Sequence, residues 1–108
     1  MPLTPMPKGA LAMLILRVLK RGRLHGYAIA QRVRELSNDL LEAEEGSLYP
    51  ALQRLLLEGW VTAEWGTSDT GRRVRFYTVT PEGTKQLKRE MDEYQQVTAA
   101  IQAILRTA

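Results

Sequence analysis

Apolar residues recur at three- and four-residue intervals in three stretches of the first half of the chain, which is the spacing of one face of a helix. We expect helices from Lys8 to about residue 21, over residues 26–36, and from just after Glu45-Gly46 to Gly59. Prolines at positions 2, 5 and 7 predict an extended arm before the first helix. The side chains expected to face the core are Leu11, Leu14, Ile15, Val18, Leu19, Ile29, Val33, Leu36, Leu48, Leu52, Leu55 and Leu56.

A two-residue period replaces the helical spacing after Gly59. Residues 60–65 and 72–79 predict two strands, joined by the polar turn at residues 68–71. Alternation places residues 73, 75 and 77 on one face of the second strand and residues 72, 74 and 76 on the other. We expect the first face to meet phosphates and the second to turn Val74 and Phe76 into the core. Trp60 and Trp65 are also expected in the core.

A fourth helix is predicted from Thr80-Pro81 to the C-terminus, with Thr80 as N-cap and Pro81 at the first helical position. Its apolar residues form a heptad-like seam that a core this small has little room to bury, so we expect it to pair two copies of the chain. The alternative is a core helix within one chain. The predicted dimerisation residues are Leu87, Met91, Tyr94, Val97, Ile101, Ile104 and Leu105.

The order helix, helix, helix, hairpin, helix is that of a winged helix-turn-helix with a long C-terminal helix. We therefore predict a mainly α fold with a small β-hairpin. Residues 1–80 are predicted to form a DNA-binding domain and residues 81–108 a dimerisation helix. A chain of 108 residues is long enough for one core but too short for two.

Composition argues against catalysis. With one histidine and no cysteine the chain offers no metal-ligand cluster, and no glycine-rich phosphate loop is present. We expect no enzymatic activity, no cofactor and no metal. The longest apolar stretch, residues 10–16, is too short to cross a bilayer, and no signal-peptide cleavage pattern follows it. We therefore expect a cytoplasmic protein without membrane contact.

Charge is distributed in blocks, although the net charge is only +3. Residues 8–34 contain seven basic side chains and no acidic one, whereas residues 35–45 contain five acidic side chains and no basic one. The hairpin adds Arg72, Arg73 and Arg75. A surface with a separate basic side attracts polyanions, so double-stranded DNA is the first partner to consider.

The third helix is the predicted reader of base sequence, because the second helix of such a motif enters the major groove through its N-terminal residues. Ser47 is expected to cap this helix, and Tyr49, Gln53 and Arg54 to reach bases or phosphates. The alternative is that Ser47 only caps and Tyr49 only packs. The full set of predicted DNA contacts is Lys8, His25, Tyr27, Ser47, Tyr49, Gln53, Arg54, Arg72, Arg73, Arg75 and Tyr77.

Several motifs in this order resemble the PadR family of bacterial transcriptional regulators, over nearly the whole chain. They are His25-Gly26-Tyr27, the run 46–52 (GSLYPAL), Arg54-Leu55, Glu58-Gly59 and the run 71–80 (GRRVRFYTVT). A mild departure lies at Val74-Arg75, where the family often has lysine. The chain is similar to the short branch of the family, with one helix after the winged domain. The resemblance implies a homodimeric, DNA-binding repressor that a small molecule releases from its operator.

The resemblance also implies a hydrophobic effector site at the dimer interface, where an aromatic residue of the last helix stacks on planar ligands. The matching position is Tyr94, with Met13 and Met91 as adaptable lining. Packing alone is the alternative role for Tyr94. A rival function is a winged-helix module for protein–protein contact without DNA binding. The arginine-rich hairpin and the basic first half of the chain favour DNA.

Overall fold

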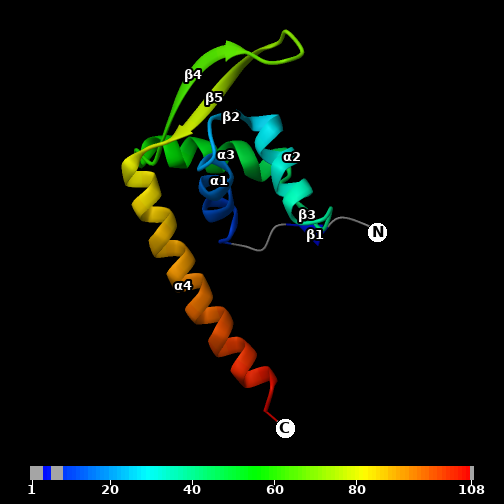
Figure 1. Cartoon of the computed structure of the whole chain (residues 1–108), viewed down its shortest axis with the longest axis vertical. Helices are drawn as coiled ribbons and strands as arrows, with labels where there is room; N and C mark the ends of the chain where they lie inside the picture. The colour runs from blue at the N-terminus through cyan, green and yellow to red at the C-terminus, as the bar shows by residue number, and fades with distance from the viewer. Residues whose placement is uncertain (1–3, 6–8, 108) are drawn as a thin grey trace.

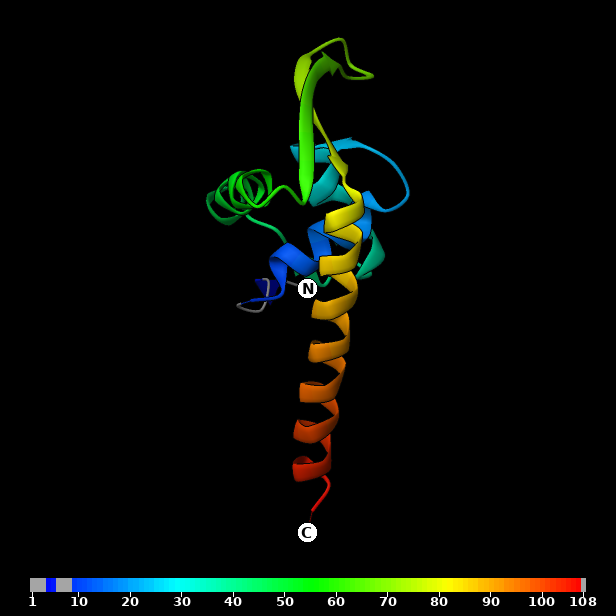
Figure 2. The same cartoon turned by 90° about the vertical axis from the view of Figure 1, so that its left-hand side faces the viewer.

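The predicted winged helix-turn-helix with a long C-terminal helix is confirmed by a computed structural model, which describes residues 4–5 and 9–107 (Figure 1). Helices α1, α2 and α3 form a compact group, from which a β-hairpin and helix α4 project in opposite directions (Figure 2). The elements in chain order are β1 (Thr4–Pro5), α1 (Leu11–Leu19), β2 (Leu24–His25), α2 (Gly26–Leu36), β3 (Leu41–Glu42), α3 (Glu45–Leu57), β4 (Val61–Thr67), β5 (Arg73–Val79) and α4 (Pro81–Leu105).

Three strands form an antiparallel sheet in the order β2-β5-β4. The hairpin β4–β5 was predicted, but the short strand β2, which pairs Leu24 with Tyr77, was not. A second, parallel pair joins β1 to β3. Each of these additional strands is two residues long, which is too short to show a two-residue period in the sequence.

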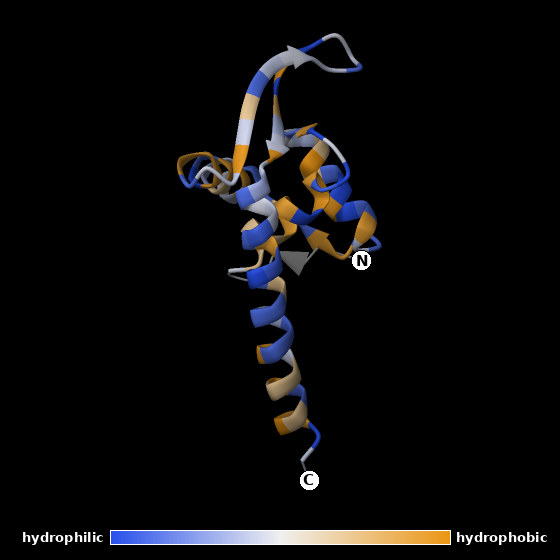
Figure 3. Ribbon diagram, turned by 60° about the vertical axis from the view of Figure 1, so that its left-hand side comes forward, coloured by the Kyte–Doolittle hydropathy of each residue, from blue (hydrophilic) through white to orange (hydrophobic). Residues whose placement is uncertain are grey.

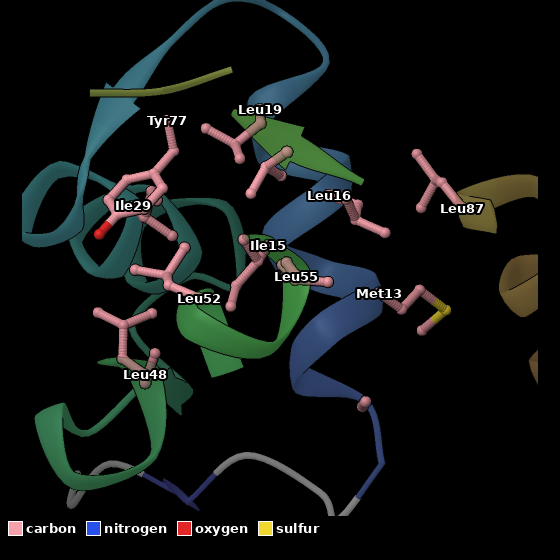
Figure 4. Packing of buried hydrophobic residues seen from close by; sticks show 13 residues of the cluster. Met13, Ile15, Leu16, Leu19, Ile29, Leu48, Leu52, Leu55, Tyr77 and Leu87 are labelled. Atoms are coloured by element: carbon pink, nitrogen blue, oxygen red, sulfur yellow. The ribbon is translucent and has the colours of Figure 1, made fainter. Parts of the chain in front are cut away.

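Helix α1 lies at the centre of the core and contacts α2, α3, α4 and β5. Its Ile15, Leu16 and Leu19 are fully buried, and Figure 4 shows them within the hydrophobic cluster. Ile29 in the middle of α2 is equally buried. The prediction that Leu36 faces the core is wrong, because this last residue of α2 is 62% exposed.

The end of α3 is hydrogen-bonded directly to the start of α4, at a contact that we call the α3–α4 joint (Gly59, Trp60, Thr80 and Gly83). The Thr80 hydroxyl donates to the Gly59 carbonyl at 2.8 Å and accepts from the Gly83 N–H at 3.0 Å, which confirms Thr80 as the predicted N-cap. The Thr80 N–H donates to the Trp60 carbonyl. A Cβ at position 83 would overlap that carbonyl oxygen, so only glycine fits there.

Helix α4 is 25 residues long, about 37 Å at 1.5 Å per residue, and accounts for much of the 56 Å length of the molecule. Among the described residues, no helix combines the length and the apolarity that crossing a membrane requires.

Candidate nucleic-acid interface

The hairpin β4–β5, which we call the wing, pairs residue for residue from Val61 and Val79 at its base to Thr67 and Arg73 near its tip. The loop at the tip is closed by a hydrogen bond from the Ser68 N–H to the Arg72 carbonyl at 2.8 Å. Gly71 takes a φ of +82° in this loop, a conformation that L-residues with side chains rarely adopt. The wing is therefore a defined arm rather than a loose loop.

One face of the wing changes from core to solvent along its length. Tyr77 at the base is 5% exposed and belongs to the core, whereas Trp65 nearer the tip is 59% exposed. Two sequence predictions are wrong for this reason. Tyr77 does not meet phosphates, because the face that it shares with Arg73 and Arg75 turns toward the helices at the base. Trp65 is not in the core, because β4 and β5 extend beyond the core and Trp65 lies on the part that projects into solvent.

Two arginines stack on the exposed part of this face. The Arg73 guanidinium lies 4.9 Å from the centre of the Trp65 ring and that of Arg75 lies 5.8 Å from it. Arg75 also lies 5.9 Å from the Tyr77 ring. These distances are those of cation–π contacts. Among the described residues, neither Arg73 nor Arg75 makes an ion pair with a carboxylate.

The opposite face of the wing is contacted by an arginine that precedes β2 and does have a carboxylate partner. Arg23 pairs with Glu64 at 2.8 Å and lies 4.2 Å from the centre of the Phe76 ring. The His25 ring meets Phe76 edge-on at 5.8 Å. The prediction that Phe76 and Val74 enter the core is wrong, since both are only partly buried and lie outside the core cluster.

Helix α3 begins two residues before the predicted cap. Its N-cap is Glu44, so the prediction that Ser47 caps the helix is wrong; Ser47 instead lies within the first turn, with its side chain exposed. Gln53 and Arg54 are exposed, as a role in base or phosphate contact requires. Their contact with DNA stays a prediction.

Tyr49 packs against the start of α2, although 47% of it is exposed. A Cβ on Gly26 would lie 2.6 Å from the Tyr49 hydroxyl oxygen, so the glycine makes room for the ring. Burial raises the pKa of the Tyr49 hydroxyl above its ordinary value of 10.0, and the charges of Glu45 and Tyr77 raise it further. The shift moves the pKa further from pH 7, where a tyrosine hydroxyl is already neutral at its ordinary pKa.

Four predicted DNA contacts remain, and two of them lie at the start of α2. His25 is the N-cap of α2, because its Nδ1 accepts the Ala28 N–H at 3.4 Å. The Tyr27 side chain is 67% exposed beside it. Arg72 is exposed at the wing tip. Lys8 lies outside the described residues.

The predicted dimerisation residues divide into two groups along α4. Leu87 is 4% exposed and lies in the core of its own chain, so its prediction as a contact between copies is wrong. Met91 packs partly against the same core. The other five predicted residues are about half to three-quarters exposed, and Figure 3 shows apolar residues toward the C-terminal end of α4. They are Tyr94, Val97, Ile101, Ile104 and Leu105.

A cavity of about 140 Å³ lies between α1 and α4, and all three predicted effector contacts line it. Met13, Met91 and Tyr94 form the wall together with Leu14, Arg17 and Gln95. The structure therefore brings together three residues that are up to 81 positions apart in the sequence.

Sequence reasoning missed three residues of this interface: Trp65, Arg23 and Gly26. For Trp65 the sequence indicated the wrong register, because pairing around a residue 68–71 turn would place it opposite Val74, whereas the five-residue loop 68–72 places it opposite Arg75. The Arg23–Glu64 pair joins residues 41 positions apart and left no signal in the sequence. Gly26 belongs to one of the predicted motifs, but its close approach to Tyr49 was not predicted.

These features define a winged helix-turn-helix protein with an arginine-bearing wing and an exposed second helix of the motif. The chain belongs to the transcriptional regulator PadR-like family, whose model matches residues 15–89. The predicted resemblance is thereby confirmed, and the chain is a PadR-family transcriptional regulator.

Individual relatives agree with this membership. The chain is 32% identical over 73 residues to the negative transcriptional regulator PadR of Bacillus subtilis (strain 168), a match that spans 68% of this chain and 40% of that protein. A transcriptional regulator from Clostridium thermocellum has a similar structure, with a TM-score of 0.84, 29% identity, and coverage of 92% of this chain and 96% of that one. A PadR family regulator from Clostridium difficile R20291 has a TM-score of 0.76 at 27% identity, covering 90% and 99%.

Proposed function

We propose that this protein is a homodimeric, sequence-specific DNA-binding repressor that a small hydrophobic effector releases from its operator. Residues 1–80 contact DNA in this proposal, and residues 81–108 pair the two subunits. Family membership supports the regulatory role, and the B. subtilis relative is itself a negative regulator.

The observation that carries the proposal is the pair of arginines on the wing, Arg73 and Arg75, which have no carboxylate partner among the described residues. An arginine with unpaired N–H donors binds a phosphate through charge-assisted hydrogen bonds. Contacts of this kind supply affinity without sequence preference. Arg72 at the exposed tip adds a third cation to the same arm.

Sequence preference would come from α3. Ser47, Gln53 and Arg54 are exposed along this helix, and Tyr49 presents half of its surface beside them. Glutamine and arginine form paired hydrogen bonds with adenine and guanine in the major groove. The Tyr49 hydroxyl, which is neutral near pH 7, would serve as donor or acceptor. Two such helices in a two-fold dimer require a palindromic operator.

The exposed half of α4 supports pairing of two chains. Residues 94–105 contain no charged side chain, and four aliphatic residues among them, Val97, Ile101, Ile104 and Leu105, are more than half exposed. Such a stripe is stabilised by burial against an equally apolar surface. A second copy of the chain offers that surface, related by a two-fold axis.

The cavity between α1 and α4 is the proposed effector site. At about 140 Å³ it is smaller than the roughly 300–1,000 Å³ of typical ligand sites, so the partner's copy of α4 would complete the wall. Tyr94 would stack on a planar ligand, and Met13 and Met91 would adapt to its outline. An occupied cavity would change how the two subunits pack.

A salt series tests DNA binding. The probe is a fluorescent duplex from the region upstream of the gene, compared with a random-sequence duplex, and the readout is anisotropy. We expect log affinity to fall linearly with log salt concentration. Replacing Arg72, Arg73 and Arg75 with alanine should flatten that line by about 0.9 for each phosphate that the wing no longer neutralises, and should weaken binding to both duplexes alike.

A matched control variant removes the same number of positive charges at positions outside the wing. Lys88→Ala, Arg89→Ala and Arg106→Ala together remove three positive charges from α4 and its C-cap and should leave the slope unchanged. An unaltered slope in the wing variant would rule out the wing as the phosphate contact. Failure of the parent to bind either duplex would favour the rival function, a winged-helix module for protein–protein contact.

A further inference from the structure

Trp65 is the one large aromatic side chain on the wing that burial does not explain. Its ring is 59% exposed, whereas Tyr77 on the same face is buried. An indole gains little by standing in water, since its stabilising contribution comes mainly from burial and from contacts of its π face. The contacts of the Trp65 ring, rather than its burial, therefore have to account for its position on the wing.

The ring contacts the two wing arginines that have no carboxylate partner in residues 4–5 and 9–107. Trp65 lies opposite Arg75 in the strand register, and the guanidinium groups of Arg73 and Arg75 lie 4.9 and 5.8 Å from its centre. Arg75 in turn lies 5.9 Å from the ring of Tyr77. A row of contacts, Tyr77–Arg75–Trp65–Arg73, thus runs from the core to the tip of the wing.

This row orders the arginines without using their hydrogen-bond donors. A guanidinium stacks through its flat face, and its N–H groups point outward in the plane, where a phosphate binds. Arg23 on the opposite face shows the alternative, since its Nη1 donates to Glu64 at 2.8 Å. A carboxylate partner competes with phosphate, whereas an aromatic partner does not.

We propose that Trp65 is a positioning residue for DNA binding, which holds Arg73 and Arg75 in extended, stacked conformations so that their N–H donors meet the phosphate backbone already ordered. The inference rests on the proposed DNA binding. An arginine that is immobilised before binding loses less conformational entropy when the complex forms. Trp65 therefore raises affinity without itself contacting DNA.

Replacing Trp65 with alanine should weaken DNA binding about tenfold, the loss that corresponds to mobilising two arginine side chains. The slope of log affinity against log salt should stay at the parent value, because both arginines still reach their phosphates in the complex. Trp65→Phe should restore most of the affinity, because phenylalanine also presents a π face. Leu36→Ala, at an aliphatic residue of similar exposure (62%), is the control and should have no effect.

A double-mutant cycle separates positioning from direct contact. In a background of Arg73→Ala with Arg75→Ala, the further change Trp65→Ala should have no effect on affinity, since the residues through which Trp65 acts are absent. A further tenfold loss in that background would overturn the proposal and assign Trp65 a direct contact. A flattened salt slope for Trp65→Ala alone would overturn it as well.

The free protein supplies a readout that needs no DNA. Removing both arginines should shift the tryptophan emission and increase its quenching by acrylamide, because the Trp65 ring is then left without its stacked neighbours. Unchanged emission and quenching would overturn the stack in solution. If the parent fails to bind DNA while this shift occurs, the proposed function fails and the stack stands; if the parent binds and the cycle shows no coupling, the inference alone fails.

Discussion

The wing and the C-terminal half of α4 both leave the core, at opposite ends of the molecule, yet they expose opposite kinds of side chain (Figure 1). The wing exposes arginines stacked on an aromatic ring, whereas residues 94–105 of α4 expose aliphatic side chains and no charge. Exposed cations with unpaired donors gain from meeting an anion, and exposed aliphatic groups gain from leaving water. The two projections of one small domain are therefore suited to two different partners.

The largest effect is expected from charging the apolar projection. Ile101→Glu with Ile104→Glu should raise the dissociation constant of the dimer at least about 100-fold. The reason is that a two-fold interface would bury both new charges from each of the two subunits. Sedimentation velocity over a concentration series measures the change. Gln96→Glu with Ala103→Glu adds the same charge on other sides of α4 and should leave the dimer intact; a monomeric parent would contradict the pairing altogether.

A second prediction contrasts the base of the wing with its tip. Tyr77→Ala removes a buried ring and should lower the free energy of unfolding by about 3–5 kcal/mol. Trp65→Ala removes a ring of which most is already exposed and should lower it by less than about 1 kcal/mol. Urea denaturation followed by circular dichroism, at one protein concentration, measures both values. Equal losses would show that the wing face does not pass from core to solvent as described.

The smallest expected effect concerns the two faces of the wing. Glu64→Gln removes the carboxylate partner of Arg23 and should tighten DNA binding about threefold at low salt, with the gain shrinking as salt rises. Anisotropy with the labelled duplex measures it. Glu93→Gln removes one acidic side chain from α4 and is the control. No gain for Glu64→Gln would mean that Arg23 lies outside the reach of the phosphate backbone.

Much of the fold followed from periodicity and capping rules. The bounds of α2 and the capping role of Thr80 were predicted because glycine, proline and threonine carry strong local preferences. Alternation on β5 was also right about which residues share a face. The alternation does not decide which face of β5 packs against the core, because each face has an aromatic residue, Tyr77 on one and Phe76 on the other.

The errors in the site have a common physical origin. Hydrophobicity predicted Trp65 in the core, but whether a ring is covered depends on how far a strand extends beyond the helices, which is a tertiary property. Ser47 satisfies the rule for a cap residue, yet α3 begins earlier, after Glu44. The three residues placed around an effector by the family resemblance and by the adaptability of methionine do line one cavity between α1 and α4, and their contact with a ligand stays a prediction.

The α3–α4 joint fixes the start of the long helix α4 to the residues that follow α3. Because Gly83 leaves no space between α4 and the Trp60 carbonyl, and Thr80 is hydrogen-bonded to Gly59, the first turn of α4 is held against the residues that follow α3. Over a helix about 37 Å long, each degree of rotation at the joint displaces the far end by roughly 0.6 Å. A tilt of a few degrees at one end of α4 is thus a shift of ångströms at the other.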